Sequence, residues 1–485
     1  MIDIQAIKSK ILDLAMRGQV TEQLPEDGTA DALYTQIQSE ITALVESGKV
    51  KQEKPLPEIS AEEYPFQIPN SWRWVYLGEL FQHNTGKALN ASVRQGEMME
   101  YITTSNLYWD HFELDDLKQM PFTESEVEKC TVTKGDLLVC EGGDIGRSAI
   151  WPFDYDMRIQ NHIHKLRKYS NSICTEFYYY LLWYYKLTGR INGIGIGLQG
   201  FSSKRVHSLI VPLVPYNEAT RIVQKIQKAF AILDNIDAIQ IQYADNRAVL
   251  KSKLIDAAIQ GKLTEQLPDD GTAEELYQQI QVEKLELAKA GKIKKEKPLP
   301  EITEDEIPFE IPDNWKWVRL ASICRQITDG THKTPTYQKE GIPFLSVKNI
   351  SAGYLDLSDI KYIPKSEHDE LIKRCQPQKN DVLICRIGTL GKALRFDTDL
   401  EFSIFVSLGL VKTGNQVLSD HLVSVINSEY GSNWIQSIKA GGAMHAYKIN
   451  LTDLNMLPVP LPPLAEQKRI AEKLDEALRT FDVQQ

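Results

Sequence analysis

The chain has 485 residues, of which 42% are hydrophobic and 25% charged, with a formal net charge of −11. This length predicts two to four domains with ample core, and the composition is ordinary for a soluble globular protein. No apolar stretch approaches the length of a membrane span, and the N-terminus lacks a signal-peptide layout, so we expect a cytoplasmic protein.

The acidic charge is unevenly distributed. Residues 66–212 hold 15 Lys and Arg against 16 Asp and Glu, and residues 309–460 hold 17 against 16. The remaining segments carry the whole net negative charge. The two near-neutral bodies can therefore present local basic faces to a polyanion while the rest of the chain is acidic.

Residues 1–65 are predicted to be mostly helical, with two breaks. The turn Leu24-Pro-Glu-Asp-Gly28 precedes a helix over Ala30–Glu46, which Thr29 would cap. Lys54-Pro-Leu-Pro-Glu58 then forms an extended linker. The same order of turn, helix and linker recurs from residue 264 to residue 301.

Residues 218–263 predict one long helix, because they hold no proline and a single glycine at their end. Apolar residues recur at alternating steps of three and four, which is typical of a coiled-coil seam. At about 1.5 Å per residue this helix spans roughly 65–70 Å, so another segment must lie along it. The seam is formed by Ala219, Ile222, Ile226, Ala229, Leu233 and Ile236, and its spacing continues through Gln240, Tyr243 and Arg247 to Leu250 and Leu254.

Both halves of this helix occur a second time, at the two ends of the chain. Lys251-Ser-Lys-Leu-Ile-Asp256 returns as Lys8-Ser-Lys-Ile-Leu-Asp13, an offset of 243, and Glu218-Ala-Thr-Arg-Ile222 returns as Glu466-Gln-Lys-Arg-Ile470, an offset of 248. The chain is thus a two-fold internal repeat that is cut open inside one of its two helices. We expect its ends to meet and close a pseudo-twofold ring.

Each linker leads to a body with the same opening. Ile68-Pro-Asn-Ser-Trp-Arg-Trp-Val75 matches Ile311-Pro-Asp-Asn-Trp-Lys-Trp-Val318. We interpret Trp72 and Trp315 as anchors that pack each body onto the helix ends.

Inside the bodies, short β-type runs are repeated while the segments between them diverge. Lys134–Cys140 matches Lys379–Cys385, and a glycine turn follows each: Gly143-Asp-Ile-Gly-Arg147 and Gly388-Thr-Leu-Gly-Lys392. Proline-punctuated strands close the two bodies at Ile210–Pro215 and Leu457–Pro463. We predict two mixed α/β domains, and a repeated scaffold with a varied surface indicates two related readers of different targets.

The cysteine pattern favours packing over chemistry. Cys130 and Cys140 recur as Cys375 and Cys385 at an offset of 245, and no Cys-x-x-Cys occurs. We expect reduced, mostly buried cysteines and no metal site.

Enzymatic motifs do not emerge from the sequence. No amino-methyltransferase Asp/Asn-Pro-Pro-Tyr/Phe is present, and Gly388–Lys392 lacks the first glycine of a phosphate loop. The glycines of residues 193–197 lack the dinucleotide-binding spacing. Asp136 and Glu141 are interpreted as strand-end carboxylates and not as a nuclease pair, because the equivalent of Glu141 in the second body is Arg386.

Taken together and in order, these motifs resemble the specificity subunits of type I restriction–modification enzymes, over essentially the whole chain. They include Thr328-Asp-Gly-Thr-His-Lys333 followed by Ile342–Asn349, similar to a common opening of a target recognition domain, and the C-terminal Pro460-Leu-Pro-Pro-Leu-Ala-Glu-Gln-Lys-Arg-Ile470. The first body departs from the commoner opening, with Gln82-His-Asn-Thr-Gly-Lys87 in its place.

The resemblance implies a DNA-recognition subunit without catalytic activity. Two target recognition domains would each read one half of a bipartite, asymmetric site in double-stranded DNA. An antiparallel coiled coil would set their separation and dock two modification subunits. The implied parts are an N-terminal helical region (1–65), a first target recognition domain (66–215), a central helical region with the long spacer helix (216–308), a second target recognition domain (309–460) and a C-terminal spacer helix (461–485).

The resemblance also implies that this chain itself holds no cofactor. S-adenosylmethionine would be bound by the modification subunits, which methylate adenine. ATP and Mg²⁺ would be bound by a restriction subunit where one joins the complex.

For DNA contact, Arg158–Lys168 stands out with four Lys and Arg, two His and no acid. If it forms one strand, Arg158, Gln160, His162 and His164 share a face, and Asn161 and Lys165 lie on the other. Gln and Asn can read adenine edges and Arg or Lys guanine. A solvated edge strand guarded by charge is the alternative.

Gly-rich loops and polar strand ends supply further candidates, because flexible backbone with amide, hydroxyl and cationic donors can approach phosphates; structural turns and simple surface charge are the alternatives. The residues predicted to contact DNA are Lys87, Arg147, Arg158, Gln160, Asn161, His162, Lys165, Gln199, Ser202 and Lys204 in the first body, and Thr331, His332, Lys333, Ser346, Lys348, Asn349, Arg386, Lys392, His445, Tyr447 and Lys448 in the second.

The aromatic run Phe177–Tyr185 is interpreted as a buried helix, with a base-stacking platform as the alternative. Two other functions are kept open. One is a coiled-coil scaffold that binds only proteins, and the other is a DNA-modifying enzyme with unrecognised motifs.

Overall fold

The computed structural model describes residues 1–89, 95–191, 200–295, 297–442 and 445–482. The chain divides into two compact units, Met1–Gln240 (unit 1) and Ile241–Gln485 (unit 2). Within the described ranges, no helix combines the length and the apolar character needed to cross a bilayer.

The first two α-helices of unit 1 begin at N-terminal caps, one of which, Thr29, the sequence predicts. Thr29 accepts a hydrogen bond from the backbone N–H of Ala32 at the start of α2, and Asp3 accepts one from Ala6 at the start of α1. The helices are α1 (Ile4–Met16), η1 (Pro25–Asp27), α2 (Ala30–Glu46), η2 (Ala61–Glu63), η3 (Leu77–Glu79), α3 (Glu124–Cys130), α4 (Thr175–Leu187), α5 (Ser203–His207) and α6 (Tyr216–Ile259), which continues into unit 2.

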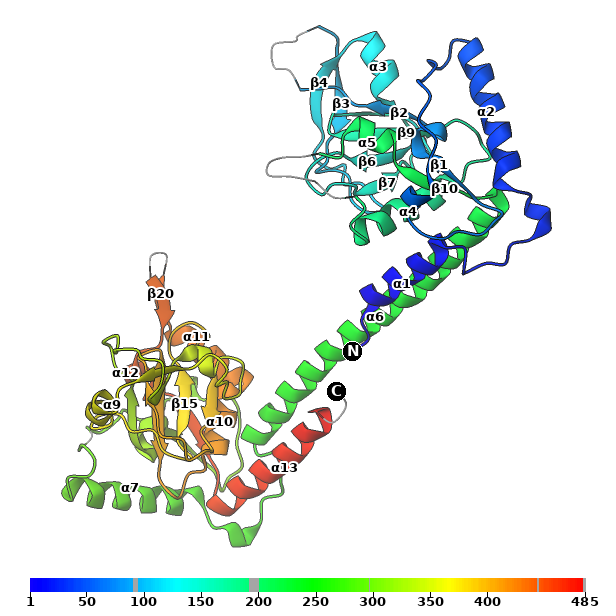
Figure 1. Cartoon of the computed structure of the whole chain (residues 1–485). Helices are drawn as coiled ribbons and strands as arrows, with labels where there is room; N and C mark the ends of the chain where they lie inside the picture. Colours follow the sequence, from blue (N-terminus) through cyan, green and yellow to red (C-terminus); the bar gives the residue numbers. More distant parts are fainter. Residues whose placement is uncertain (90–94, 192–199, 296, 443–444, 483–485) are drawn as a thin grey trace. The chain divides into compact units, whose positions relative to one another are not determined.

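Two four-stranded sheets and one strand pair build the body of unit 1 (Figure 1). The first sheet, in the order β2-β9-β6-β7, is antiparallel, and the second has the order β4-β3-β8-β5 with β3 and β8 parallel. The strands are β1 (Arg73–Tyr76), β2 (Phe81–Thr85), β3 (Glu97–Ile102), β4 (Lys118–Phe122), β5 (Thr131–Val132), β6 (Leu137–Cys140), β7 (Ser148–Ile150), β8 (Met157–Ile159), β9 (Ile163–Lys168) and β10 (Ile210–Leu213).

The single strand expected over Arg158–Lys168 is wrong. The chain forms β8, turns at residues 160–162, and then enters β9 in a different sheet. The expected sharing of faces across this stretch is therefore wrong too. Charge and alternation are local properties, whereas the turn is fixed by the pairing of β8 with β3 and of β9 with β2 and β6.

Unit 2 repeats this plan, with three strands instead of four in its second sheet. Its main sheet has the order β12-β18-β15-β16, its second sheet the order β14-β13-β17, and β11 pairs with β21 as β1 pairs with β10. Its strands are β11 (Lys316–Arg319), β12 (Cys324–Asp329), β13 (Ile342–Leu345), β14 (Lys361–Ile363), β15 (Val382–Cys385), β16 (Ala393–Arg395), β17 (Ser403–Ile404), β18 (Leu408–Thr413), β19 (Ala440–Gly442), β20 (His445–Lys448) and β21 (Pro458–Leu461). Its helices beyond α6 are η4 (Pro268–Asp270), α7 (Ala273–Lys289), η5 (Glu304–Glu306), α8 (Leu320–Ile323), η6 (Val347–Asn349), α9 (Lys365–Leu371), α10 (Ser419–Asn427), α11 (Glu429–Ile438), α12 (Leu451–Leu454) and α13 (Leu464–Asp482).

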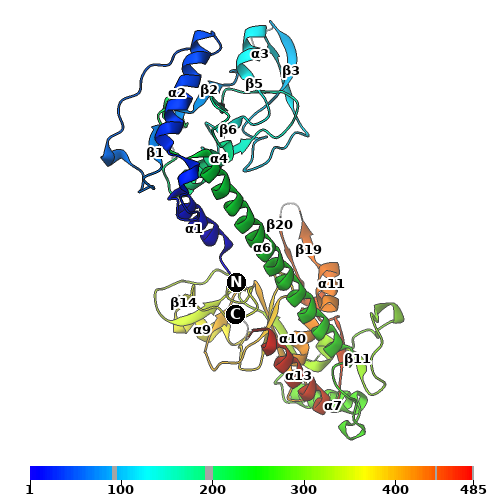
Figure 2. The same ribbon diagram turned by 90° about the vertical axis from the view of Figure 1, so that its right-hand side faces the viewer.

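In unit 1, α1 lies antiparallel along the first part of α6 (Figures 1 and 2). The ammonium of Lys8 pairs with Asp234, and the side chain of Gln240 bonds the backbone of Ile2. The predicted seam residues on this part of α6 face inward, with Ile222 and Ile226 fully buried.

In unit 2, α13 lies antiparallel along the second part of α6 (Figure 1). Ile470 and Leu474 pack with Ala258, and Arg247 donates to the backbone carbonyl of Phe481. Each half of α6 thus pairs with a segment that resembles its other half in sequence, as the repeat predicts.

Each body is joined to its helices by a buried carboxylate. In unit 1 Glu218 accepts hydrogen bonds from the indole of Trp72 (2.9 Å), the amide of Gln23 (2.8 Å) and the hydroxyl of Thr21 (3.3 Å). The corresponding group in unit 2 consists of Glu466, Trp315 (2.8 Å), Gln266 (2.8 Å) and Thr264 (3.0 Å). The predicted role of the tryptophans as anchors is confirmed.

The aromatic run forms α4, whose Phe177, Tyr178, Leu181 and Tyr185 are buried in the core of unit 1. This confirms the predicted buried helix. All six cysteines are buried and free, and burial raises the pKa of Cys140 and of Cys385 to about 11, as expected for packing cysteines.

Candidate nucleic-acid interface

Five segments of unit 1 meet at one end of its first sheet. Because β2 and β6 run antiparallel to β9 and β7, the segments after β2 and β6 come out beside the segment before β9. The ends of β3 and β8 reach the same place, since Gln160 N–H donates to the carbonyl of Ile102 at 3.0 Å. We call the group the unit 1 loop cluster, and it consists of residues 86–89, 103–106, 141–147, 160–162 and 200–202.

Close backbone contact explains the glycine that opens this cluster. A Cβ on Gly86 would lie 2.0 Å from the carbonyl oxygen of Ile159, so no larger residue fits. The next residue, Lys87, donates its N–H to Ile159 at 3.0 Å and accepts from Asn161 at 2.9 Å. The turn at residues 160–162 is thereby fixed against the end of β2.

Unit 2 has the same frame. A Cβ on Gly330 would lie 2.0 Å from the carbonyl oxygen of Ile404, and Thr331 exchanges hydrogen bonds of 3.0 Å with Ile404 and Val406. The unit 2 loop cluster consists of residues 330–333, 346–349, 386–392, 405–407 and 447–450.

One position joins three segments in each cluster. In unit 1 Glu141 donates its N–H to the carbonyl of His162 at 2.8 Å and accepts from Phe201 at 2.7 Å. In unit 2 Arg386 makes the same two bonds, to Ser407 and from Ile449, at 2.9 Å each. The two units therefore share this backbone arrangement, but the side chain at the shared position is negatively charged in unit 1 and positively charged in unit 2.

Among the predicted DNA contacts of unit 1, some present their side chains to solvent and others are partly covered. Arg147 lies over the ring of Tyr108 and donates to the carbonyl of Thr104, and Arg158 donates to the sulfur of Met99 at 3.4 Å. His162, Ser202 and Lys204 are exposed, while Gln160 and Asn161 are half-buried. Of these, all but Lys204 and Arg158 belong to the unit 1 loop cluster.

Two predicted contacts of unit 1 are lysines whose ammonium groups are hydrogen-bonded to other groups of the protein. The ammonium of Lys87 bonds the carboxylate of Glu126 and the carbonyl of Pro121, both at 2.6 Å. The ammonium of Lys165 is buried and donates to the carbonyls of Lys129 (2.9 Å) and Thr131 (2.8 Å), and its burial lowers the pKa of Lys165 to about 8. Neither side chain is placed to reach a phosphate.

The predicted contacts of unit 2 divide in the same way. His332, Lys333, Lys348, Tyr447 and Lys448 are exposed, and Thr331, Ser346 and Lys392 are half-buried. Asn349 is buried, and its side chain holds the turn after β13 by accepting from Ser346 N–H (2.9 Å) and donating to the carbonyl of Asp356 (3.0 Å).

Arg386 is the one buried cation among the described predicted contacts of unit 2. Its guanidinium pairs with Asp329 and donates to the carbonyl of Ile449 at 3.0 Å. Burial opposes ionisation of Asp329, but the hydrogen bond from His332 and the guanidiniums of Arg386 and Arg374 outweigh it and lower the pKa of Asp329. The Arg386 side chain therefore links Asp329 at the end of β12 to the backbone of Ile449 inside the domain.

Two further predicted contacts cannot be placed. Gln199 lies outside the described residues. The backbone of His445 belongs to β20, but its side chain is likewise outside what the structure describes.

A pair of histidines, the buried His164 and the half-buried His83, supports the unit 1 loop cluster. His164 Nε2 lies 2.6 Å from the carbonyl of Phe201, which can only accept, so that nitrogen carries the proton. His164 Nδ1 then accepts from His83 Nε2 at 2.9 Å. Burial lowers the pKa of His83 to about 3 and that of His164 to about 4, so both are neutral near pH 7. His164, predicted to share a strand face with DNA contacts, instead holds the backbone of Phe201.

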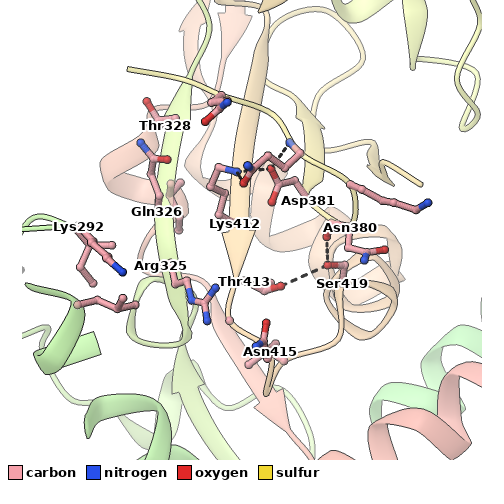
Figure 3. A pocket seen from close by; sticks show the side chains of 18 of the residues that line it. Lys292, Arg325, Gln326, Thr328, Asn380, Asp381, Lys412, Thr413, Asn415 and Ser419 are labelled. Atoms are coloured by element: carbon pink, nitrogen blue, oxygen red, sulfur yellow. Dashed lines mark hydrogen bonds and ion pairs between the residues drawn. The ribbon is translucent and has the colours of Figure 1, made fainter. Parts of the chain in front are cut away.

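Unit 2 also carries a polar groove of about 1390 Å³ along β12 and β18 (Figure 3). Eight Lys and Arg and two Asp line it, and six of the eight cations pair with carboxylates. One of these pairs, Lys412 with Asp381 at 2.6 Å, lies in the centre of the view. The ion pairs offset most of the positive charge, so the groove adds less to an anion-binding face than its composition indicates.

The interpretation of Glu141 as a mere strand-end carboxylate misses its place at the junction of three segments. The signal was present in the repeat: Glu141 and Arg386 follow equivalent strands yet differ in charge. A difference in charge at equivalent positions of a repeat indicates that the side chain has a different role in each of the two bodies.

Comparisons with known proteins agree with this geometry. Residues 69–247 and 312–485 both match the family described as "Type I restriction modification DNA specificity domain". The chain therefore belongs to the family of type I restriction–modification specificity subunits. Within such a system its role is DNA sequence recognition and not catalysis.

Two curated relatives from Escherichia coli align with nearly the whole chain. The type I restriction enzyme EcoAI specificity subunit is 27% identical over 98% of this chain and 89% of that protein. The EcoEI specificity subunit is 24% identical over 99% of this chain and 90% of that protein.

Solved structures share the fold. The HsdS subunit from Thermoanaerobacter tengcongensis has a TM-score of 0.51 at 18% identity, covering 86% of this chain and 92% of that chain. A chain from a type I restriction–modification system has a TM-score of 0.56 at 20% identity, covering 86% and 93%.

Proposed function

We propose that this chain reads a bipartite, asymmetric sequence in double-stranded DNA for a type I adenine methyltransferase complex, with each loop cluster reading one half. The observation that carries the proposal is the pair of equivalent frames with different side chains. Residues 160–162 are Gln, Asn and His, and their counterparts 405–407 are Phe, Val and Ser. Base-edge contacts specify sequence, so frames with different donors and acceptors suit two different half-sites.

Exposed cations give each domain the means to hold DNA in register. Lys204 near the unit 1 loop cluster, and Lys333, Lys348 and Lys448 in the unit 2 loop cluster, are solvent-exposed. Phosphate contacts position a protein on the duplex without reading sequence. Each domain alone would bind weakly, and the covalent link makes the second contact effectively intramolecular.

The boundaries that we propose for the recognition domains are 66–215 and 309–460, with helical regions at 1–65, 216–308 and 461–485. We propose that α6 acts as the spacer that sets the gap between the half-sites. Closure of the ring by the two chain ends stays a prediction.

Modification subunits are the proposed partners of the helical regions. Ile232 and Ile239 lie one heptad apart on α6 and are 62% and 55% exposed. Ile232 also lines a small apolar hollow, together with Ile11, Val20, Ile226 and Ala229. Exposed apolar surface on a helix pair suits the docking of further helices. S-adenosylmethionine belongs to those subunits in this proposal, and ATP with Mg²⁺ to a restriction subunit where one is present.

Methylome mapping tests the proposal directly. The chain would be expressed with its modification subunits in cells that lack other adenine methylation, and methylated adenines would be located by long-read sequencing. We expect one bipartite motif with two unlike halves and a fixed gap. An absence of sequence-dependent methylation and DNA binding would instead favour a protein-only scaffold, and methyl transfer by the isolated chain would favour an enzyme.

A further inference from the structure

Glu141 has a carboxylate at the centre of the unit 1 loop cluster that pairs with no Lys or Arg of the described residues. Its side chain is 26% exposed, and among the described residues its only ion-pair partner is His162, with Nδ1 at 3.8 Å. That distance is longer than a hydrogen bond. The other acid of the same loop, Asp144, is instead paired with Lys186 at 2.7 Å.

The surroundings of Glu141 hold its backbone rigidly and leave space beside it. Its N–H and carbonyl are both bonded, to His162 and Phe201. A Cβ on Gly200 would lie 2.9 Å from Cγ of Glu141, so the glycine allows this approach. Gly142 and Gly143, which follow it, have no atom of the described residues within 4 Å of an added Cβ. With its backbone fixed in this way, Glu141 can present its carboxylate to the edge of a base.

A carboxylate on a DNA-binding face is repelled by phosphates unless a specific donor satisfies it. Within the major groove the available donors are exocyclic amino groups, on N4 of cytosine and N6 of adenine. We propose that Glu141 is a specificity-determining residue that accepts a hydrogen bond from the amino group of one base in the half-site read by unit 1. This rests on the proposed function and assigns one position within it.

The chemistry also says what Glu141 rejects. Thymine O4 and guanine O6 are acceptors, and an acceptor-only carboxylate facing them leaves both groups unsatisfied in a desolvated interface. In unit 2 the equivalent Arg386 is folded inward onto Asp329, so this form of exclusion belongs to unit 1 alone.

The test is Glu141→Gln in the complete complex, read by methylome mapping. An amide keeps the size of the side chain but can donate as well as accept. We expect discrimination against keto bases to fall about 10- to 100-fold at a single position of one half-site. The other half-site and the gap should be unchanged. The base that wild type prefers at that position, cytosine or adenine, identifies the amino group.

Glu128→Gln makes the same chemical change at an exposed position of α3, outside the unit 1 loop cluster, and should leave the motif unchanged. Glu141→Ala covers the case in which the amide disturbs folding, and it should lose the same preference while the thermal midpoint of the complex is retained. An unchanged motif in both Glu141 variants, a uniform loss of methylation without altered preference, or a keto base at the affected position in wild type would each overturn the inference. In each of these outcomes the wild-type complex still methylates a bipartite motif, so only the role of Glu141 fails. If the proposed function itself were wrong, the wild-type complex would show no bipartite motif.

Discussion

The indole N–H of Trp315 donates to the carboxylate of Glu466 at 2.8 Å, and Glu466 is fully buried. The same acid also accepts from Gln266 and Thr264. One side chain therefore ties together the start of the unit 2 body, the turn before α7, and α13. The duplicate around Glu218 in unit 1 indicates that this joint is a requirement of the architecture.

Removing that carboxylate should be strongly destabilising. Glu466→Ala leaves three donors without an acceptor inside the protein, and we expect a loss of about 2–4 kcal/mol in the free energy of unfolding. Thermal and denaturant unfolding would measure it. Glu466→Gln should cost less, and Glu472→Ala, at an exposed position of α13, should change stability by less than about 0.5 kcal/mol. Equal effects of the two alanine variants would contradict the assignment.

Arg386→Ala should lower the stability of the fold, and any loss of DNA binding should follow from that loss of stability. It would leave Asp329 buried with less compensation, and breaking such a buried pair costs about 3–5 kcal/mol. Lys348→Ala, at an exposed position of the same cluster, should keep the melting temperature while weakening DNA binding and reducing its salt dependence. Unfolding scans paired with a salt titration of DNA affinity separate the two effects. An Arg386→Ala variant of wild-type stability would contradict a stabilising role for the buried pair with Asp329.

The histidine pair makes unit 1 sensitive to acid. The folded pKa of His164 is about 4 against 6.5 for the free side chain, so the unfolded chain binds the proton first as pH falls. The stabilising contribution is complete above pH 6.5 and is lost between that value and about 4. At pH 5 we expect protonation of His164 in the unfolded chain to have lowered the free energy of unfolding by about 2 kcal/mol relative to its value at neutral pH. His164→Gln should flatten the pH dependence of the thermal midpoint between pH 7 and 5, while His111→Gln, an exposed control, should not.

The exposed isoleucines of α6 give a test of partner docking. Ile232→Asp and Ile239→Asp place charge on surface that the folded chain leaves in water, so unfolding should change little. Binding of the modification subunit should weaken by an order of magnitude or more, measured by calorimetry or co-purification. Gln224→Asp, on the same helix at another exposed position, should bind normally. Wild-type affinity in both isoleucine variants would place the partner elsewhere.

The spacer role of α6 predicts a change in the recognised sequence. Four residues inserted after Gln240 lengthen a helix by about 6 Å, which corresponds to about two base pairs. Methylome mapping of the variant should show unaltered half-sites with a longer gap. A gap that stays constant while methylation persists would exclude α6 as the ruler.

Much of the fold follows from the sequence because the repeat makes it visible. The caps at Thr29 and Thr272, the continuous α6 and the matched tryptophans depend on short-range patterns that occur twice. Which side chains of the two domains are free to contact DNA cannot be predicted from such short-range patterns. Lys165 and Arg386 look like surface cations, and only the tertiary pairing of strands brings backbone carbonyls to them.

The turn at residues 160–162 shows the same limit for backbone. A run of polar residues with alternating character is compatible with one strand, and nothing local marks the change of sheet after Ile159. The pairing of β8 with β3 and of β9 with β2 and β6 fixes the turn, and the close approach of Gly86 to the carbonyl of Ile159 holds it against the end of β2. The contact between Gly86 and Ile159 joins residues more than seventy positions apart in the sequence.

The carboxylate joints at Glu218 and Glu466 have a consequence for how such proteins diversify. No atom of either joint belongs to a loop cluster, so mutations that alter what a loop recognises do not weaken the attachment of the body. A body exchanged at the Ile-Pro-x-x-Trp and proline-rich boundaries would bring its own tryptophan to the joint. We therefore expect it to attach to these helices without compensating changes in them.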